Sequence, residues 1–272
     1  MPYGRQEWEE QMETVRSADG TTIAFERAGS GPALIMVGGA FNDHTTMTGT
    51  AALLADRFTT YCYDRRGRGS SGDTPPYAVE REVEDLAALV AHAGGEAALF
   101  GHSSGGVLVL QAAARGLPIT RLAVYEPSYI VGTDRPRPPA DMAEQLEELV
   151  AAGRPADAAR LFLSECAGVP AEVIDMMQGS PDWEPLEALA PTLSYDVALH
   201  GPGQSMTDVL ATIGVPSLVL AGGAGEAWMQ NTARAVAAAV PGARLHTIEG
   251  EDHAVLHHPE VLAPVLAGFL GG

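Results

Sequence analysis

The stretch that decides the fold is "EAALFGHSSGGVLVLQAAARG", residues 96–116. It starts as an apolar run typical of a buried strand, turns at "GHSSGG" and continues as an apolar helix. Gly101, Ser103 and Gly105 fit the G-x-S-x-G pattern, in which a sharp strand-to-helix turn lifts a serine hydroxyl above the sheet. The small neighbours let the backbone pass through the turn without a clash. We therefore interpret Ser103 as a nucleophile, the alternative being a purely structural tight turn.

Strands and helices alternate on both sides of this turn. The helix expected over residues 77–95 repeats Val79, Val83, Leu86 and Val90 at helical spacing, so that one face packs on a sheet. Strands are expected at the hairpin flanking "ADG" and at "PALIMVG", "TTYCYD", "RLAVYEP", "PSLVLAGG" and "ARLHTIEG". This alternation predicts an α/β fold with a mainly parallel sheet flanked by helices.

The alternation is interrupted in the middle of the chain. From residue 127 to 208 no core strand is expected, whereas "DMAEQLEELVAAG" and "PADAARLFLSECAG" resemble short amphipathic helices. Asp141 and Glu144 have the spacing of an acidic N-cap and its partner, and a third helix over 183–199 is broken by Pro191. We expect a helical cap at 127–208, inserted into a core made of 1–126 and 209–272.

A serine nucleophile needs a base, and the chain offers eight histidines. His253 is the best placed, because it lies in a loop between a late strand and the last helix. His257 and His258 fall near the start of that helix, where solvation or capping is expected. His102 is the variable residue of the turn and is expected to point away from the nucleophile. His253 is therefore the predicted general base.

Two backbone N–H groups can serve as donors to an oxyanion. The N–H of Ser104 begins the helix after the nucleophile, where the helix dipole favours negative charge. The second is expected from "GGAFNDH", residues 38–44, where Gly38 and Gly39 allow a close backbone approach. The N–H of Ala40 is the candidate there, and a simple glycine turn is the alternative.

Taken together, these motifs resemble the α/β-hydrolase fold family, over essentially the whole chain. "GHSSGG" is similar to the family's nucleophile turn, "YDRRGRGSSG" to its "YDxRGxGxS" motif, and "GEDH" to the loop of its histidine. The resemblance implies acyl transfer by Ser103 without a metal or an organic cofactor. A serine there also disfavours epoxide opening and dehalogenation, which use an aspartate in this family. Gly38 stands where many members have the histidine of "HG".

The acid of the expected triad is missing from its usual place. The family pattern "GxxD" reads "GGAG" here, with Gly225 at the acidic position. Three carboxylates could replace it. Glu226 comes one residue late, Asp252 is adjacent to His253, and Glu126 ends a neighbouring strand. Zearalenone-type lactone hydrolases look similar in carrying a glutamate after this strand, so Glu126 is preferred. Its alternative role is a structural carboxylate.

The substrate is expected to be a small molecule held between the core and the cap. Gly39, Phe41, Met142, Met177 and Trp183 are the candidate contacts, although core packing would equally explain the cap residues. An uncharged, fairly apolar ester or lactone fits this surface best. A non-hydrolytic binder of small molecules and a biosynthetic lyase or cyclase are the alternatives, because Gly225 and Gly38 depart from the family pattern.

Composition limits the partners. A formal net charge of −19 disfavours nucleic acids and anionic membranes, since both repel an acidic surface. The first residues are polar and acidic, and no apolar run approaches the roughly 20 residues that span a bilayer, so a cytoplasmic location is expected. Two cysteines are too few for a disulfide framework. A monomer and a homodimer both remain open.

Overall fold

The computed structural model describes residues 12–132, 137–200 and 206–271. Within them, one sheet has the strand order β1-β2-β4-β3-β5-β6-β7-β8. The pairs β1–β2 and β2–β4 are antiparallel, and the strands from β4 through β8 pair in parallel. The predicted fold class is therefore confirmed. The strands are β1 (Glu13–Arg16), β2 (Thr22–Gly29), β3 (Ala33–Val37), β4 (Thr59–Tyr63), β5 (Ala97–His102), β6 (Ile119–Tyr125), β7 (Ser217–Gly222) and β8 (Arg244–Ile248).

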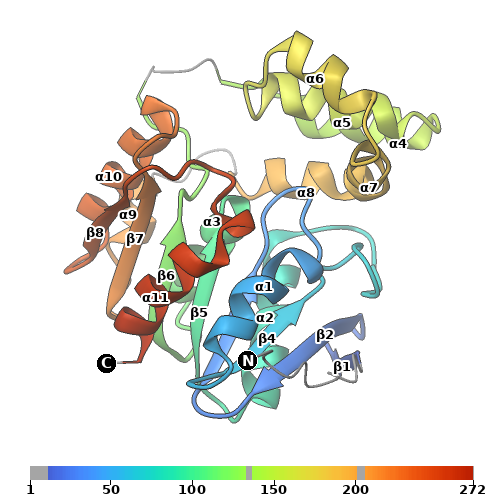
Figure 1. Cartoon of the computed structure of the whole chain (residues 1–272). Coiled ribbons are helices and arrows are strands. Elements are labelled where there is room, and N and C mark those ends of the chain that lie inside the picture. The colour runs from blue at the N-terminus through green and yellow to red at the C-terminus, as the bar shows by residue number, and fades with distance from the viewer. Residues whose placement is uncertain (1–11, 133–136, 201–205, 272) are drawn as a thin grey trace, which may run out of the picture.

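Helices lie on both faces of this sheet (Figure 1). The helices are α1 (Thr45–Leu54), α2 (Val79–His92), α3 (Ser104–Ala114), α4 (Met142–Ala151), α5 (Pro155–Glu165), α6 (Ala171–Gln178), α7 (Trp183–Leu189), α8 (Leu193–Ala198), α9 (Met206–Leu210), α10 (Ala227–Ala239) and α11 (Pro259–Leu270), with short 3₁₀ helices η1 (Ala190–Thr192) and η2 (Val255–His257). No helix in the described part of the chain is long and apolar enough to cross a membrane.

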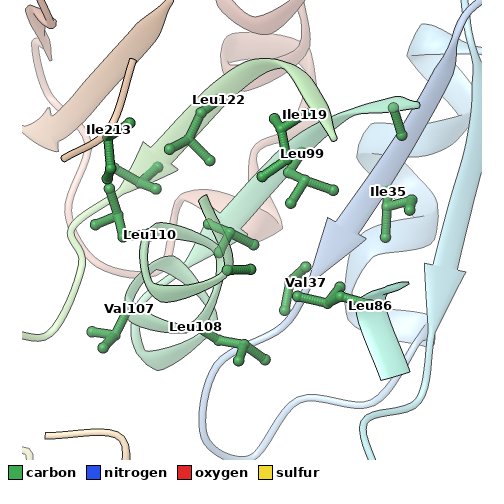
Figure 2. Close-up of a cluster of buried hydrophobic side chains, with 14 of the residues drawn as sticks. Ile35, Val37, Leu86, Leu99, Val107, Leu108, Leu110, Ile119, Leu122 and Ile213 are labelled. Carbon is green, nitrogen blue, oxygen red and sulfur yellow. The ribbon is translucent and has the colours of Figure 1, made fainter. Parts of the chain in front are cut away.

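Alternate residues of the central strands enter two separate cores. Ile35 and Val37 of β3 pack with α2, α3, α9 and α10, in the cluster that Figure 2 shows. Leu34 and Met36 of the same strand pack on the other face with α1 and α11. Since successive side chains of a strand point to opposite faces, this double burial explains why β3 reads as a continuous apolar run.

A third cluster joins the helices α4 to α8. It gathers Met142, Leu146, Leu163, Trp183 and Leu193. In Figure 1 the helices α4–α7 stand beyond one end of the sheet, and α8 runs between them and the core. The described residues between 127 and 208 form helices and loops, and 133–136 and 201–205 lie outside the described residues.

The predicted N-cap position of α4 is confirmed, but the side-chain capping expected there is not found. Asp141 occupies the N-cap position, but its side chain makes no capping hydrogen bond. Its φ of −95° and ψ of 16° differ from the extended backbone that usually turns an N-cap side chain toward the first free N–H groups. The Asp141 Oδ1 instead accepts a 2.9 Å hydrogen bond from Gln145 Nε2.

Candidate active site

The turn between β5 and α3 holds Ser103 in a strained backbone conformation. Its φ is 56° and its ψ is −123°, which a residue other than glycine adopts rarely. The Ser103 N–H donates to the carbonyl of Tyr125 at 3.0 Å, which ties the turn to β6. The side chain of Ser103 is partly exposed, while its neighbours on both sides are buried. The turn therefore presents one hydroxyl at the end of the sheet.

The loop after β3 lies directly against this serine. A Cβ atom added to Gly39 would stand 2.7 Å from Ser103 Cβ and 3.3 Å from its Oγ, so only glycine fits. A Cβ on Gly38 would stand 2.7 Å from Cβ of Asn42, whose Oδ1 accepts a 2.9 Å hydrogen bond from the Gly39 N–H. Asn42 thus occupies space beside Gly38 and holds the loop, in which Ala40 directly follows Gly39.

His253 and Glu126 form a direct hydrogen bond. Nδ1 of His253 lies 2.7 Å from Oε2 of Glu126. The Glu126 side chain is fully buried, whereas that of His253 is 37% exposed. The other carboxylate oxygen, Oε1, accepts a 2.9 Å hydrogen bond from the N–H of Gly222. An imidazole whose Nδ1 side is fixed by a buried carboxylate presents Nε2 for chemistry.

The other two carboxylates are used elsewhere. Glu226 is exposed at the N-cap of α10. Asp252 Oδ1 accepts a 2.8 Å hydrogen bond from the N–H of Ala254. A Cβ on Gly225 would lie 3.1 Å from Oε1 of Glu126. The carboxylate of Glu126 therefore fills the space that a side chain at position 225 would need.

The side chain of His102 contacts the loop of His253. Its Nε2 lies 2.9 Å from the carbonyl oxygen of His253, and the two rings are 4.7 Å apart. Because that carbonyl can only accept, Nε2 of His102 carries the proton. Burial, with the nearby charge of His253, lowers the pKa of His102 to about 3, so the ring is neutral. The turn residue before Ser103 thus supports the loop of His253, a contact with no signal in the sequence.

The candidate substrate contacts divide into two groups. Phe41 has a φ of 58° and packs edge-on against the ring of Phe162 at 5.6 Å. Met177 is partly exposed. Met142 has no exposed surface and Trp183 only 7%, which fits the packing alternative for these two side chains.

A buried ionic cluster next to the serine turn was not expected from the sequence. Oδ1 of Asp196, from α8, accepts hydrogen bonds of 2.6 Å from both Ser104 Oγ and Arg65 Nη1. Its Oδ2 accepts one of 2.7 Å from Arg68 Nη2. Burial opposes ionisation of Asp196, but the charges of Arg68 and Arg65 outweigh it and hold the pKa of the carboxyl below its usual value. The sequence signal that could have predicted this cluster was the three arginines of "YDRRGRGSSG", because arginines that become buried need carboxylate partners.

Sequence comparison agrees with this architecture. A sequence model described as the alpha/beta hydrolase family matches residues 14–265. The chain therefore belongs to the alpha/beta hydrolase family. Among solved structures, an alpha/beta hydrolase from Sphaerobacter thermophilus is similar along nearly the whole chain. It is 51% identical with a TM-score of 0.89, and the match covers 94% of this chain and 99% of that one.

More distant relatives carry named activities. A thermophilic esterase from Thermogutta terrifontis shares the fold, with a TM-score of 0.73 and 24% identity over 96% of this chain and 98% of that chain. N-formylmaleamate deformylase from Pseudomonas putida is 37% identical over 116 residues, which are 41% of this chain and 43% of the deformylase. The match thus spans less than half the length of that curated relative.

Proposed function

We propose that the protein is a serine hydrolase that cleaves an ester or lactone of a small, fairly apolar substrate through an acyl-enzyme. The observation that carries the proposal is the 2.7 Å hydrogen bond between His253 Nδ1 and the buried carboxylate of Glu126. Ser103, held at a φ of 56°, directly follows His102, whose ring centroid lies 4.7 Å from that of His253. A nucleophile, a base and a group that orients the base form the minimal set for this chemistry.

In the proposed mechanism Ser103 attacks the substrate carbonyl, and Nε2 of His253 takes its proton. Glu126 keeps the other ring nitrogen of His253 protonated and stabilises the imidazolium that forms. The N–H groups of Ala40 and Ser104 bind the oxyanion. The imidazolium then protonates the leaving group, and a water molecule activated by His253 releases the acyl group from the serine.

We also propose that residues 127–208 act as a cap that selects the substrate. The position of α4–α8 beyond the end of the sheet supports this role (Figure 1). Phe41, from the loop after β3, and Met177, from α6, are partly exposed apolar groups that pack against the third cluster. The buried Arg65 and Arg68 are already paired with Asp196, so they are poor partners for an anionic substrate, and an uncharged one is favoured.

An amide is the second candidate substrate, because one relative is named as a deformylase of an N-formyl compound. The same nucleophile, base and oxyanion donors would serve, since esters and amides both pass through a tetrahedral intermediate. An ester and an amide that carry the same acyl group distinguish the two candidate substrate classes. Esters also hydrolyse faster than amides without an enzyme. The quantity to compare is therefore kcat/KM divided by the uncatalysed rate constant of the same compound.

The proposal is tested with a fluorophosphonate probe and a panel of p-nitrophenyl esters. Wild-type protein is expected to be labelled at Ser103 and to hydrolyse short and medium acyl chains. Ser103→Ala is expected to lose both properties, because the residual rate without the nucleophile is orders of magnitude lower. Its melting temperature should stay within about 2 °C, since the partly exposed hydroxyl contributes little packing.

Two results would contradict the proposal. Hydrolysis by pure Ser103→Ala protein would remove the serine from the mechanism. A wild-type protein that neither reacts with the probe nor cleaves any ester, lactone or amide of the panel would favour the non-hydrolytic alternatives, a small-molecule binder or a lyase or cyclase.

A further inference from the structure

The orientation of one peptide group, between Gly39 and Ala40, determines whether the Ala40 N–H can serve the reaction. The C=O and the N–H of a trans peptide point in opposite directions. The Gly39 oxygen of this peptide accepts a 2.5 Å hydrogen bond from Arg68 Nη1 and a 3.3 Å bond from the Asn42 N–H. These bonds fix the carbonyl, and with it the opposite direction in which the Ala40 N–H points.

The same arginine is connected to the second donor. Arg68 Nη2 donates to Oδ2 of Asp196, and the Oδ1 of that carboxylate accepts from the hydroxyl of Ser104. Ser104 carries the other N–H at the start of α3. Within the described residues neither the Ala40 nor the Ser104 N–H donates to a backbone acceptor. Both donors are therefore free, and one chain of hydrogen bonds holds the groups that carry them.

This chain of bonds is fully enclosed. Arg68 is 2% exposed and Asp196 is 1% exposed. Hydrogen bonds between ionised groups in such surroundings are stronger than in water, and a cation on a carbonyl oxygen strengthens the N–H donor of the same peptide. Asp196 comes from α8, so a residue far along the sequence, outside the motifs of the core, contributes to this arrangement.

We propose that Asp196 and Arg68 are positioning residues that align both oxyanion donors, so that α8 is part of the machinery that binds the transition state. Neither side chain touches the substrate; each acts through Ser104 or the Gly39–Ala40 peptide. The inference rests on the proposed function, since it concerns the oxyanion of that reaction. It predicts that disrupting the pair lowers kcat much more than it raises KM, because the oxyanion forms only in the transition state.

The decisive variant replaces both charges at once. Arg68→Met with Asp196→Asn leaves Arg65 paired with Glu82 through two 2.6 Å hydrogen bonds, so no buried charge is stranded. The matched control is Arg66→Met with Asp85→Asn. Arg66 and Asp85 are a neighbouring buried pair joined by two hydrogen bonds, of 2.8 and 2.7 Å, and neither is hydrogen-bonded to the Gly39–Asn42 loop or Ser104. Arg66 also donates to the partly exposed Asp19 at 2.9 Å, so the control removes at least as many ionic contacts as the decisive variant.

The measurements are kcat and KM for p-nitrophenyl butyrate, the inhibition constant of phenylboronic acid, and the melting temperature of each full-length variant. Phenylboronic acid forms a tetrahedral adduct with a serine, so its affinity reports on the oxyanion site. The Arg68/Asp196 double variant is expected to lose roughly 10- to 100-fold in kcat, less than the 10²- to 10³-fold loss on removing a donor outright. Its boronate affinity should fall in parallel, while KM changes less than about threefold.

The control pair is expected to keep kcat and boronate affinity within about threefold of wild type at a comparable loss of melting temperature. Ser104→Ala is the second variant, in case the double variant does not fold. It removes the hydroxyl, retains the N–H, and should lower kcat by roughly 3- to 10-fold, since one hydrogen bond to a charged group is lost.

The outcomes separate the two proposals. Wild-type turnover that requires Ser103, with unchanged kcat in the folded double variant or in Ser104→Ala, would overturn the positioning role. Equal losses of kcat in the control pair would do the same, because they would indicate a general structural effect. Wild-type protein without turnover or labelling would refute the proposed function, and the inference with it.

Discussion

At the scale of single residues, Glu126 and Gly225 depend on each other. The acid has a φ of 43°, an unusual value for glutamate, which turns its side chain from the end of β6 toward His253. A Cβ at position 225 would approach its Oε1 to 3.1 Å. Only a glycine therefore leaves this carboxylate undisturbed. Glycine at the position where the family pattern has an aspartate is in keeping with the role proposed for Glu126.

Glu126→Gln is expected to lower kcat by roughly 10³- to 10⁴-fold on the best ester. Glutamine keeps the shape of the side chain but no longer stabilises an imidazolium, and its NH₂ group can favour the wrong tautomer of His253. Steady-state kinetics on purified variants checks the size of the loss.

Glu226→Gln is the matched control, because the side chain lies on the surface one residue beyond Gly225. It should keep kcat within about threefold of wild type. A large loss in Glu226→Gln together with a small one in Glu126→Gln would reverse the assignment. A fall in melting temperature of many degrees in Glu126→Gln would indicate a structural carboxylate.

The sequence predicts the candidate residues that sit in local motifs, Ser103 from its turn and His253 from its loop, and it prefers Glu126 among three carboxylates. The hydrogen bond between Glu126 and His253 fits that preference, because the parallel pairing of β6 and β7 places the end of β6 near the loops that follow the later strands. Asp196 and His102 could not be found in this way. Their partners lie 92 and 151 residues away, and no local pattern records such pairings.

At the scale of elements, the approach of α3 to β3 determines how the serine is presented. A Cβ on Gly105 would overlap the carbonyl oxygens of Val37 and Gly38, the last residue of β3 and the first of the following loop. The helix can start directly beneath the serine because this position has no side chain. The second glycine of G-x-S-x-G, Gly105, is thus a packing requirement between a helix and the neighbouring strand.

Gly105→Ala is expected to destabilise the fold by about 2–3 kcal/mol, because backbone carbonyls cannot move aside as a side chain can. The melting temperature should fall by roughly 5–10 °C for a domain of this size. Differential scanning calorimetry and the rate of fluorophosphonate labelling measure the two consequences, and labelling should slow as the turn is displaced.

Gly268→Ala provides the control, since an added Cβ in α11 meets no atom within 4 Å. The better helix propensity of alanine should leave stability unchanged or raise it by up to about 1 kcal/mol. Equal stability of Gly105→Ala and wild type would show that α3 can shift, and the packing argument would be lost.

The regular elements were predictable where the apolar pattern was clear. The strands and α2, α3, α4, α5 and α11 were expected from it. Three helices, α1, α6 and α9, were not. The sequence of α1, "TTMTGTAALL", has four threonines and a glycine, which are weak helix formers, and α9 has only five residues. These helices are held by tertiary contacts such as Met47 and Leu54 in the second core.

At the scale of the whole molecule, an acidic chain keeps several of its charges inside. The formal net charge is −19, yet Arg65, Arg66 and Arg68 are each at most 2% exposed. Each is paired with carboxylates, which compensates for the loss of hydration. Stability therefore depends on the protonation of buried groups, and the neutral His102 gives the clearest case.

His102 should make the folded state sensitive to mild acid. Burial first, and the charge of His253 next, lower the pKa of His102 to about 3, from 6.5 in its ordinary state. At pH 5 the unfolded chain therefore binds a proton at this residue that the folded chain does not. Above pH 6.5 the neutral His102 does not reduce the free energy of unfolding. As the pH falls from 6.5 toward 3, the free energy of unfolding decreases progressively, by about 2 kcal/mol between pH 7 and pH 5.

His44 acts in the opposite direction. Burial lowers the pKa of His44, but the hydrogen bond and the charge of Asp64 outweigh burial and raise it. Acid therefore favours the folded state at this residue. For that reason the pH dependence of wild-type stability does not isolate the contribution of His102. That contribution is obtained from the difference between wild type and a variant that lacks His102.

The comparison is urea unfolding of wild type and His102→Gln at pH 7 and pH 5. Glutamine can still donate to the carbonyl of His253 but does not titrate. Relative to this variant, wild type should lose about 2 kcal/mol on going to pH 5, while His44 contributes equally to both proteins and cancels. His246→Gln, at an exposed position of β8, should leave the wild-type difference unchanged. Parallel losses in wild type and His102→Gln would mean that His102 is protonated in the folded protein, and then the ring could not be the fixed neutral support of the His253 loop.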